Sequence, residues 1–147
     1  MLKEISIATC LVSSLAFVGC ATTTNPSTEK NLNKLQGTTW VLQEINGVKI
    51  ESQTPTNLPS IQFSSENVSG SDGCNRFTGG YAVKAKEIKL SQMASTAMAC
   101  LSATDLPNKF NDSLSKVTHY EASKNDLQLI DANKNTLLKF IPATAQK

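Results

Sequence analysis

Four cysteines and one histidine are the residues of this 147-residue chain whose types could do distinctive chemistry. A thiol can form a disulfide, bind a metal, attack a substrate or carry a lipid. The cysteines are Cys10, Cys20, Cys74 and Cys100, and the histidine is His119. The chain has no Cys-x-x-Cys pair and offers no obvious fourth ligand, so the spacing disfavours a zinc site. A catalytic thiol is equally disfavoured, because His119 is the only imidazole available as its base.

The N-terminal segment has the order of a secretory signal. Lys3 precedes an apolar run over residues 5–18, which is shorter than the ~20 apolar residues that a membrane-spanning helix needs. The run closes as Phe17-Val18-Gly19-Cys20, an apolar stretch and a small residue followed by Cys, which is typical of a bacterial lipoprotein signal. We therefore predict a signal peptide over residues 1–19 and lipidation of Cys20. The alternatives are an N-terminal helix of the mature protein and an uncleaved membrane anchor.

The predicted lipid also predicts a compartment and a disulfide. Several acyl chains on Cys20 would hold the protein firmly on a membrane. Ala21 follows Cys20, and by similarity to enterobacterial lipoproteins this favours the outer membrane, facing the periplasm. Cys10 leaves with the signal peptide. Cys74 and Cys100 then remain as a lone pair in an oxidising compartment, where we expect a disulfide that stabilises the fold by about 3–4 kcal/mol.

Composition excludes several classes of function. The net charge is +2, charges of both signs are interspersed, and no basic stripe carries interleaved aromatic residues, so we expect no nucleic-acid partner. The acidic residues are scattered and show no pairing suited to acid–base catalysis. No phosphate-binding loop or nucleotide motif occurs. The sequence therefore predicts a protein that is not an enzyme and that holds neither a metal nor a cofactor.

The remaining chain divides into three parts. Residues 20–34 are rich in Thr, Asn and Lys and carry few apolar side chains, so they are predicted to form a flexible tether. Residues 35–142 are long enough for one domain with a real core. Residues 143–147 are predicted to be a frayed tail.

Short alternating and β-branched segments predict that most of this domain is strand. Strands are expected at residues 38–45, 48–50, 60–63, 66–70, 81–83, 87–90, 118–122, 126–130 and 136–141. Asn46-Gly47 predicts a two-residue hairpin turn. The density of glycine over residues 69–80 predicts tight turns or close backbone approach.

One segment has a helical period. Leu106, Phe110, Leu114 and Val117 recur at spacings of four, four and three, which predicts a helix over residues 104–117 with one apolar face. Thr104 is positioned to cap it. Hairpins with one inserted helix predict an α+β domain, a small and mostly antiparallel barrel-like meander with one helix packed on the sheet.

Four ordered pieces of sequence resemble a known family. They are Trp40-Val41-Leu42, the run Gly73-Cys74-Asn75-Arg76-Phe77-Thr78-Gly79, the run Ser95-Thr96-Ala97-Met98-Ala99-Cys100, and the helix that ends in Leu114 and Val117. Together they are similar to META domains of the HslJ type, over nearly the whole predicted domain. The resemblance implies a small β-rich fold with a helix against the sheet, found in bacterial envelope proteins, often lipoproteins, and in heat-shock-inducible proteins. No enzymatic activity is assigned to such domains.

The motif residues have a structural and a functional interpretation. Trp40, Gly73, Phe77 and Gly79 are favoured as scaffold, with Cys74 tied to Cys100. The functional hypothesis is that the crosslink holds a polar contact rigid for a partner or ligand. That contact would be made by Asn75 and Arg76, or by Trp40 as a binding platform.

The sequence thus predicts a lipid-anchored, non-catalytic binding protein of the bacterial envelope, with a role in envelope stress tolerance and a protein partner there. One alternative is a periplasmic carrier for a small apolar ligand or lipid, which would need a sizeable apolar cavity. Another is a protease-inhibitor-like module, for which the loop at residues 51–59 is the only candidate. An enzyme would need polar groups converging around His119.

Overall fold

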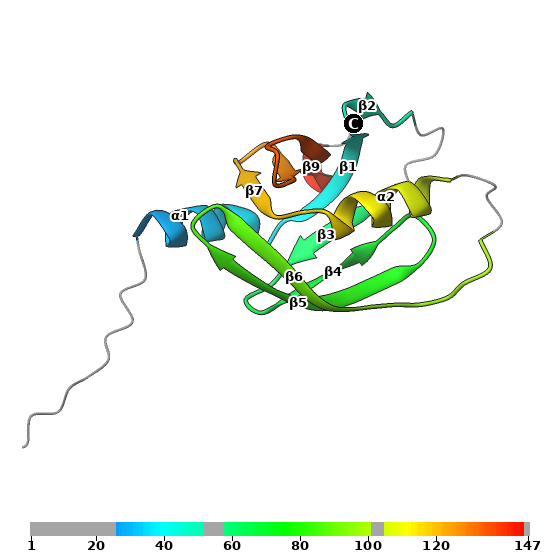
Figure 1. Cartoon of the computed structure of the whole chain (residues 1–147), viewed down its shortest axis with the longest axis horizontal. Coiled ribbons are helices and arrows are strands. Elements are labelled where there is room, and N and C mark those ends of the chain that lie inside the picture. Colours follow the sequence, from blue (N-terminus) through cyan, green and yellow to red (C-terminus); the bar gives the residue numbers. More distant parts are fainter. Residues whose placement is uncertain (1–25, 52–57, 101–104, 146–147) are drawn as a thin grey trace, which may run out of the picture.

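Antiparallel strands build one sheet that curls round and closes on itself (Figure 1). The computed structural model describes residues 26–51, 58–100 and 105–145. The strands are β1 (Thr39–Ile45), β2 (Val48–Lys49), β3 (Ser60–Phe63), β4 (Asn67–Ser71), β5 (Arg76–Lys84), β6 (Glu87–Ser95), β7 (His119–Ala122), β8 (Leu127–Ile130) and β9 (Thr136–Pro142). The helices are α1 (Pro26–Leu35), α2 (Leu106–Ser115) and a short 3-10 turn at Ala143–Ala145. The α+β class predicted from the sequence is confirmed.

The ring closes because β1 has a strand on each of its edges. One edge pairs with β3, as in Trp40 opposite Ile61, and the other pairs with β9, as in Leu42 opposite Phe140. From β3 the order runs through β4, β5, β6, β7 and β8 to β9, and the β2 hairpin extends β1 beyond β3. Three consecutive residues of β1, Trp40, Val41 and Leu42, are all buried, although successive side chains point to opposite faces of the strand.

The interior of the ring is filled by side chains. The fully enclosed large residues come from β1, β3, β4, β7, β8 and β9 and from both α-helices; they are Trp40, Tyr120, Phe63, Phe110, Phe140, Leu35, Leu42, Ile61, Leu127, Leu129, Leu138 and Val68. The predicted apolar face of α2 faces this core, where the Phe110 and Phe140 rings meet edge to face with centroids 6.4 Å apart. Aromatic pairs of this geometry contribute about 0.5–1.5 kcal/mol beyond the area that they bury.

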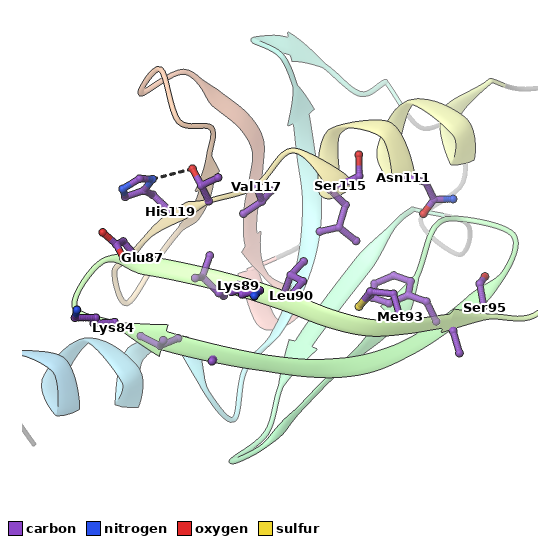
Figure 2. A pocket seen from close by; sticks show the side chains of 17 residues that line it. Lys84, Glu87, Lys89, Leu90, Met93, Ser95, Asn111, Ser115, Val117 and His119 are labelled. Carbon is purple, nitrogen blue, oxygen red and sulfur yellow. Dashed lines mark hydrogen bonds between the residues drawn. The ribbon is translucent and has the colours of Figure 1, made fainter. Parts of the chain in front are cut away.

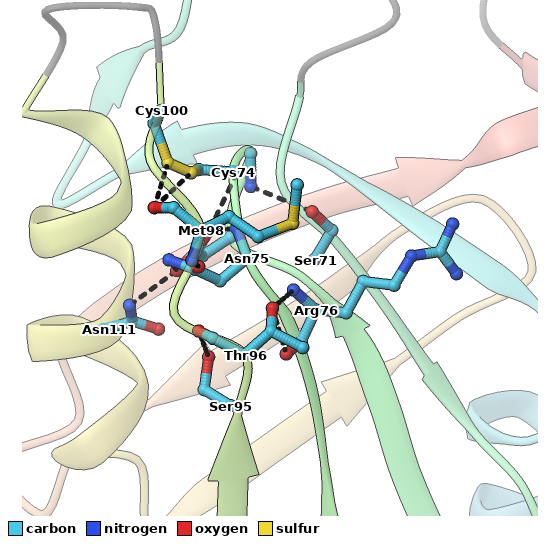
Figure 3. Close-up of a disulfide and its surroundings, with 11 residues drawn as sticks. Ser71, Cys74, Asn75, Arg76, Ser95, Thr96, Met98, Cys100 and Asn111 are labelled. Carbon is cyan, nitrogen blue, oxygen red and sulfur yellow. Dashed lines mark hydrogen bonds between the residues drawn. A yellow bond between two sulfur atoms is a disulfide. The ribbon is translucent and has the colours of Figure 1, made fainter.

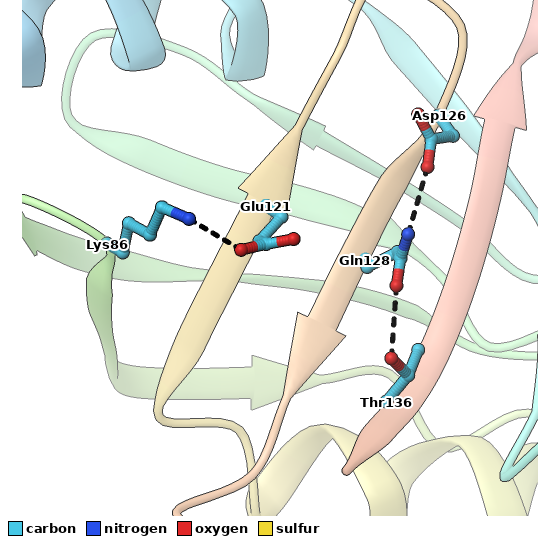
Figure 4. A network of polar contacts seen from close by, with 5 residues as sticks. All are labelled: Lys86, Glu121, Asp126, Gln128 and Thr136. Atoms are coloured by element: carbon cyan, nitrogen blue, oxygen red, sulfur yellow. Dashed lines mark hydrogen bonds and ion pairs between the residues drawn. The ribbon is translucent and has the colours of Figure 1, made fainter. Parts of the chain in front are cut away.

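The outer face of the sheet carries polar pairs between neighbouring strands (Figure 4). Lys86 Nζ lies 2.6 Å from Glu121 Oε1 on β7. Gln128 on β8 donates to Asp126 Oδ2 at 3.1 Å and accepts from the Thr136 hydroxyl on β9 at 3.0 Å. Cross-strand pairs of this kind hold register while leaving this face to solvent.

The segment predicted to be a flexible tether contains helix α1, and this part of the prediction is wrong for residues 26–34. Leu35 at the end of the helix is fully buried, and Leu32 packs against the core. The Trp40 indole N–H donates to the Leu35 carbonyl at 3.1 Å, which ties the helix end to β1. Only two apolar side chains supply this docking, too few for a periodic signal in the sequence.

Two other expectations are corrected at element ends. Thr104 lies outside the described residues, and the N-cap position of α2 is Asp105, whose side chain makes no capping hydrogen bond. The first part of the predicted frayed tail forms the 3-10 turn at Ala143–Ala145. The signal peptide and Cys20 lie outside the described residues, as do residues 52–57 of the predicted inhibitor loop. Within the described residues, no helix has the length and apolar character to cross a membrane.

The glycine-rich segment, residues 69–80, is mostly strand, with one tight turn between β4 and β5 in which Gly73 has a φ of 97°. The prediction of tight turns or close backbone approach is confirmed, because the other glycines allow close approach. A Cβ at Gly70 would lie 2.6 Å from the ring carbon Cζ of Phe77 and 2.0 Å from the Ser60 carbonyl oxygen. A Cβ at Gly79 would lie 2.4 Å from the Met93 sulfur. Strands β4 and β5 therefore form through a stretch whose glycines have low intrinsic strand propensity.

Candidate functional site

A disulfide joins Cys74 to Cys100 beside the tight turn between β4 and β5 (Figure 3). The two Cα atoms are 5.8 Å apart, a usual separation for a disulfide. We call residues 72–76 and 96–100 together the clasp. The clasp holds the segment that leaves β6 against the turn that enters β5, because Thr96 N also donates to the Arg76 carbonyl at 2.9 Å.

Asp72 is the hydrogen-bonding centre of the clasp. One carboxylate oxygen accepts from the backbone N–H groups of Cys74 at 2.9 Å and Asn75 at 2.6 Å. The other accepts from the side-chain amides of Asn111 at 2.9 Å and Asn75 at 3.4 Å. Asn111 lies on α2, so this one buried carboxylate connects the turn to the helix.

The same contacts decide the ionisation of Asp72. Burial alone would raise the pKa of its carboxyl. The hydrogen bonds from Asn111, Asn75 and Cys74 outweigh that effect together and hold the pKa below its usual value of 3.8. Asp72 is therefore an anion at neutral pH, and neutral hydrogen-bond donors stabilise its charge.

The two predicted binding residues take different roles. Asn75 is used within the clasp, since its Oδ1 accepts from the Met98 backbone N–H at 2.8 Å. Arg76 pairs with Thr96 through its backbone, and its side chain is exposed and extends away from the clasp in Figure 3. The structure thus leaves Arg76 alone to present a polar contact from the turn.

The predicted scaffold residues are placed as scaffold. Trp40 is 1% exposed and belongs to the core. Phe77 is buried and packs on the Phe110 ring with centroids 5.9 Å apart. Gly73 adopts a φ of 97°, which a residue with a side chain rarely takes, so the tight turn depends on it. Gly79 gives room to Met93 on β6.

Next to the clasp lies a groove of about 790 Å³ between β6 and α2 (Figure 2). Its apolar lining comes from three elements and includes Phe77, Val83, Ile88, Leu90, Met93, Leu114 and Val117. Its polar lining includes Lys84, Glu87, Lys89, Ser95, Asn111, Ser115, Thr118 and His119. Asn111 belongs both to the groove and to the hydrogen bonds of Asp72, so the clasp fixes one end of the groove.

The groove exists because β6 and β7 are paired only where they begin. Glu87 lies opposite His119, and the Ile88 N–H donates to the Thr118 carbonyl at 2.9 Å. Beyond that point, α2 takes the place that a neighbouring strand would occupy. Met93 is 40% exposed there and lines the groove.

His119 stands at the rim of the groove without a catalytic constellation around it. Its Nδ1 lies 2.8 Å from the Thr118 hydroxyl oxygen, and Glu87 is its neighbour across the sheet. Within residues 26–51, 58–100 and 105–145, no three His, Cys, Asp or Glu side chains gather closely enough to hold a metal ion. What this geometry offers is an apolar surface with a polar rim, which suits binding.

The family model of the META domain matches residues 33–144 of this chain. The chain belongs to the META domain family. Heat shock protein HslJ of Escherichia coli (strain K12) is 26% identical over 136 residues, which cover 91% of this chain and 94% of that protein. The resemblance predicted from the sequence is confirmed.

Solved structures share this META fold. A protein solved by NMR is 30% identical, with a TM-score of 0.60 and coverage of 74% of this chain and 92% of its own. An NMR structure from Burkholderia xenovorans has a TM-score of 0.62 at 19% identity, covering 97% and 99%. A protein of the DUF4847 family from Bacteroides vulgatus has a TM-score of 0.52 at 16% identity, covering 73% and 93%. The last two show a common fold alone.

The role of Asp72 and the presence of the groove were not predicted from the sequence. Asp72 had a local signal, because Asp directly before Gly favours a turn in which the carboxylate accepts backbone N–H groups. The groove had none. Its walls come from β5, β6, α2 and the residues that follow α2. No sequence pattern predicts that β6 and β7 separate.

Proposed function

We propose that this protein is a lipid-anchored component of the bacterial envelope whose META domain acts by non-catalytic binding in the groove between β6 and α2. We further propose that this binding contributes to envelope stress tolerance. The anchor is Cys20, and the side of attachment is the periplasmic face of the outer membrane.

The observation that carries the proposed binding is the groove itself. Its volume of about 790 Å³ lies within the range of about 300–1,000 Å³ that ligand sites occupy. Its floor is apolar, and polar side chains surround it. Its position is held by a covalent bond at Cys74 and Cys100 and by a buried carboxylate at Asp72, so the site is preorganised.

Sequence similarity supports the proposed stress role. The curated relative is named heat shock protein HslJ, and this chain spans 94% of its length. Support for the anchor comes from the Phe17-Val18-Gly19-Cys20 pattern.

Blocking the groove tests the binding function. Ser115 is exposed on α2 and lines the groove, so Ser115→Trp fills it without entering the core. Lys109→Trp places the same side chain at an exposed position on α2 that does not line the groove. We expect Ser115→Trp to reduce survival of heat-stressed cells as deletion of the whole protein does, while Lys109→Trp leaves survival unchanged. Equal survival for Ser115→Trp and the unmodified protein contradicts the proposal.

The anchor is tested separately. Mass spectrometry of the mature protein should find an acylated N-terminal Cys20, and Cys20→Ala should move the domain to the soluble fraction. A protein that remains membrane-bound after this change contradicts the anchor.

A carrier for a small apolar ligand is the second candidate, and the apolar groove floor favours it. Against an enclosed carrier cavity stands the interior of the ring, which core side chains fill. Organic extraction of the natural protein distinguishes the two candidates, because a carrier would release a bound lipid in about equimolar amount.

A further inference from the structure

We propose that the groove binds an extended peptide segment, which adds to the free edge of β6 as a further strand. Its apolar side chains alternate so that they enter the groove, and an acidic residue lies over the end near the β5–β6 hairpin. This inference rests on the proposed binding function and names the chemical class of the partner.

The first argument is the phase of the backbone groups on β6. The Ile88 N–H points to β7, where it donates to the Thr118 carbonyl at 2.9 Å. Strand residues two apart present their N–H groups to the same edge, so the N–H of Leu90 points to that edge too. Leu90 lies beyond the last residue that pairs with β7, its N–H points away from β5, and within the described residues no backbone hydrogen bond outside the strand ladders is donated by it.

An irregularity in the strand shifts this alternation by one residue. Gln92 adopts a φ of 50°, and the β5 register shifts between Thr78 and Gly80, so β6 carries a bulge there. Beyond it, the Thr96 N–H donates back to Arg76 on β5. The N–H of Ser95, one residue earlier, therefore faces the free edge again. Among residues 26–51, 58–100 and 105–145, no strand pairs with β6 along the groove from Leu90 to Ser95, an edge of about 16 Å at ~3.3 Å per residue.

The second argument is that the edge and the apolar surface coincide. Leu90, Met93 and Ser95 present backbone groups at this edge, and the same residues line the groove. An added strand that pairs with Leu90 and Ser95 would point alternate side chains toward Leu114 and Val117 on the opposite wall. Figure 2 shows Leu90 and Val117 on facing walls of this space.

An extended peptide satisfies both surfaces, and an acyl chain satisfies only one. Unpaired backbone groups at a strand edge are a template for pairing with another chain. A fatty chain entering the groove would cover the apolar walls but would leave the N–H of Leu90 without water or a partner. Burying such a group without a hydrogen bond is unfavourable, so the chemistry of the edge favours a polypeptide.

The third argument is charge. Lys84 and Lys89 lie at the hairpin end of the groove with one carboxylate, Glu87, between them. Neither lysine forms an ion pair within the part of the chain that the structure describes. A peptide carboxylate placed over this end would meet a net positive rim, which favours association and one orientation.

N-methylation of a peptide tests strand addition on the unmodified, full-length protein. The probe is a biotinylated octapeptide with Val at alternate positions, Thr between them and Glu at one end, and it is immobilised for binding measurements. One derivative carries N-methyl groups on two amides of one phase, and a second carries them on two amides of the other phase. Only one phase can face β6, so we expect one derivative to bind about tenfold more weakly and the other to bind within about threefold of the parent. Equal loss in both phases, or in neither, overturns the proposal.

Leu90→Pro tests the same bond from the protein side. Proline removes the N–H at the free edge while leaving the β5 edge intact, and edge strands tolerate it there. Leu90→Val is the matched control, because it also changes the side chain but keeps the N–H. We expect Leu90→Pro to weaken binding of the probe about tenfold, and Leu90→Val to weaken it less than about threefold. Equal weakening by the two variants overturns the proposal.

Binding measurements with the octapeptide and with palmitate distinguish failure of strand addition from failure of the proposed groove function. One outcome is that the protein binds palmitate but not the octapeptide, and that Ser115→Trp abolishes palmitate binding. That outcome overturns strand addition and supports a groove that binds lipid. A second outcome is that the protein does not bind the octapeptide but self-associates in the ultracentrifuge, and that Leu90→Pro abolishes this self-association. That outcome assigns the free edge of β6 to a second copy of the chain and overturns the proposal of a peptide ligand. Absence of binding by peptide and palmitate alike overturns both this inference and the proposed groove function.

Discussion

The sheet has two seams that differ in how they close. At the seam between β1 and β9, pairing runs from Trp40 opposite Pro142 to Ile45 opposite Leu138, and the residues behind it are buried. At the seam between β6 and β7, register holds only at Glu87 and His119. We call these the sealed seam and the open seam.

The difference between the seams separates stability from binding. The sealed seam satisfies its backbone groups and buries large side chains, so it contributes to folding and offers nothing to a partner. The open seam keeps apolar and backbone groups accessible, and the disulfide and Asp72 hold it in shape from one end. A sheet that closed completely would have no edge left to bind with.

The largest expected effect is at the sealed seam. Phe140 is fully buried on β9, so Phe140→Ala should lower the free energy of unfolding by about 3–5 kcal/mol through lost burial and a cavity. Leu90→Ala at the open seam removes a half-buried side chain and should cost about 1 kcal/mol. Urea denaturation of both variants measures the contrast. Similar losses would show that the two seams do not differ.

The next effect concerns the clasp. Replacing both cysteines in Cys74→Ser/Cys100→Ser opens a loop with a sequence separation of 26, which should cost about 3–4 kcal/mol in the chain-entropy model. The comparison is urea denaturation of the unmodified protein with and without a reducing agent, with the double variant as the control that reduction cannot change. An unmodified protein that reduction leaves as stable as before contradicts a structural role for the bond.

Asp72 should give the open seam a dependence on pH. Its pKa lies below the usual 3.8 in the folded protein, so its contribution to stability is complete above about pH 5 and is lost as the pH falls through the folded value. Asp72→Asn should cost about 1–3 kcal/mol at pH 7 and less as the pH falls through the lowered folded pKa, because the unmodified carboxyl then becomes protonated.

Urea midpoints across pH 2–7 measure this difference. Asp112→Asn is the matched control, because Asp112 on α2 is exposed and, among the described residues, its carboxylate forms an ion pair with Lys116 alone. A constant difference between Asp72→Asn and the unmodified protein across that range would show that Asp72 does not act through its charge.

The smallest effect is expected for the ion pair across the open seam. Lys86 and Glu121 have side chains that are 64% and 52% exposed, so solvent screens their attraction. Lys86→Ala should change the free energy of unfolding by less than about 1 kcal/mol, and added salt should shrink the change further. Two backbone bonds also hold the start of the seam, from the Ile88 N–H to the Thr118 carbonyl and from the Tyr120 N–H to the Lys86 carbonyl, each 2.9 Å. A larger loss in thermal denaturation would mean that the ion pair contributes more there than these backbone bonds.

Prediction from sequence succeeded where the signal was local. The Asn46-Gly47 turn, the strand at Ser60–Phe63 and the buried face of α2 through Phe110 and Leu114 all appear in the structure. Each depends on residues within a few positions of one another. The prediction of a tether failed at α1, because the docking of Leu32 and Leu35 depends on partners far along the chain.

The sequence by itself determined the family, the α+β class and the pair of cysteines available for a bond, because motif spacing and hydrophobic period are properties of the chain alone. Tertiary structure alone decided that β6 and β7 separate after Glu87, that Asn111 on α2 meets Asp72 in the turn, and that Asn75 is used within the clasp. The physical reason is that the groove forms where β6 and β7 do not pair, and local sequence patterns describe pairing and periodicity but not the absence of a neighbouring strand. Whether the edge at Leu90 stays free depends on where closing the ring places α2.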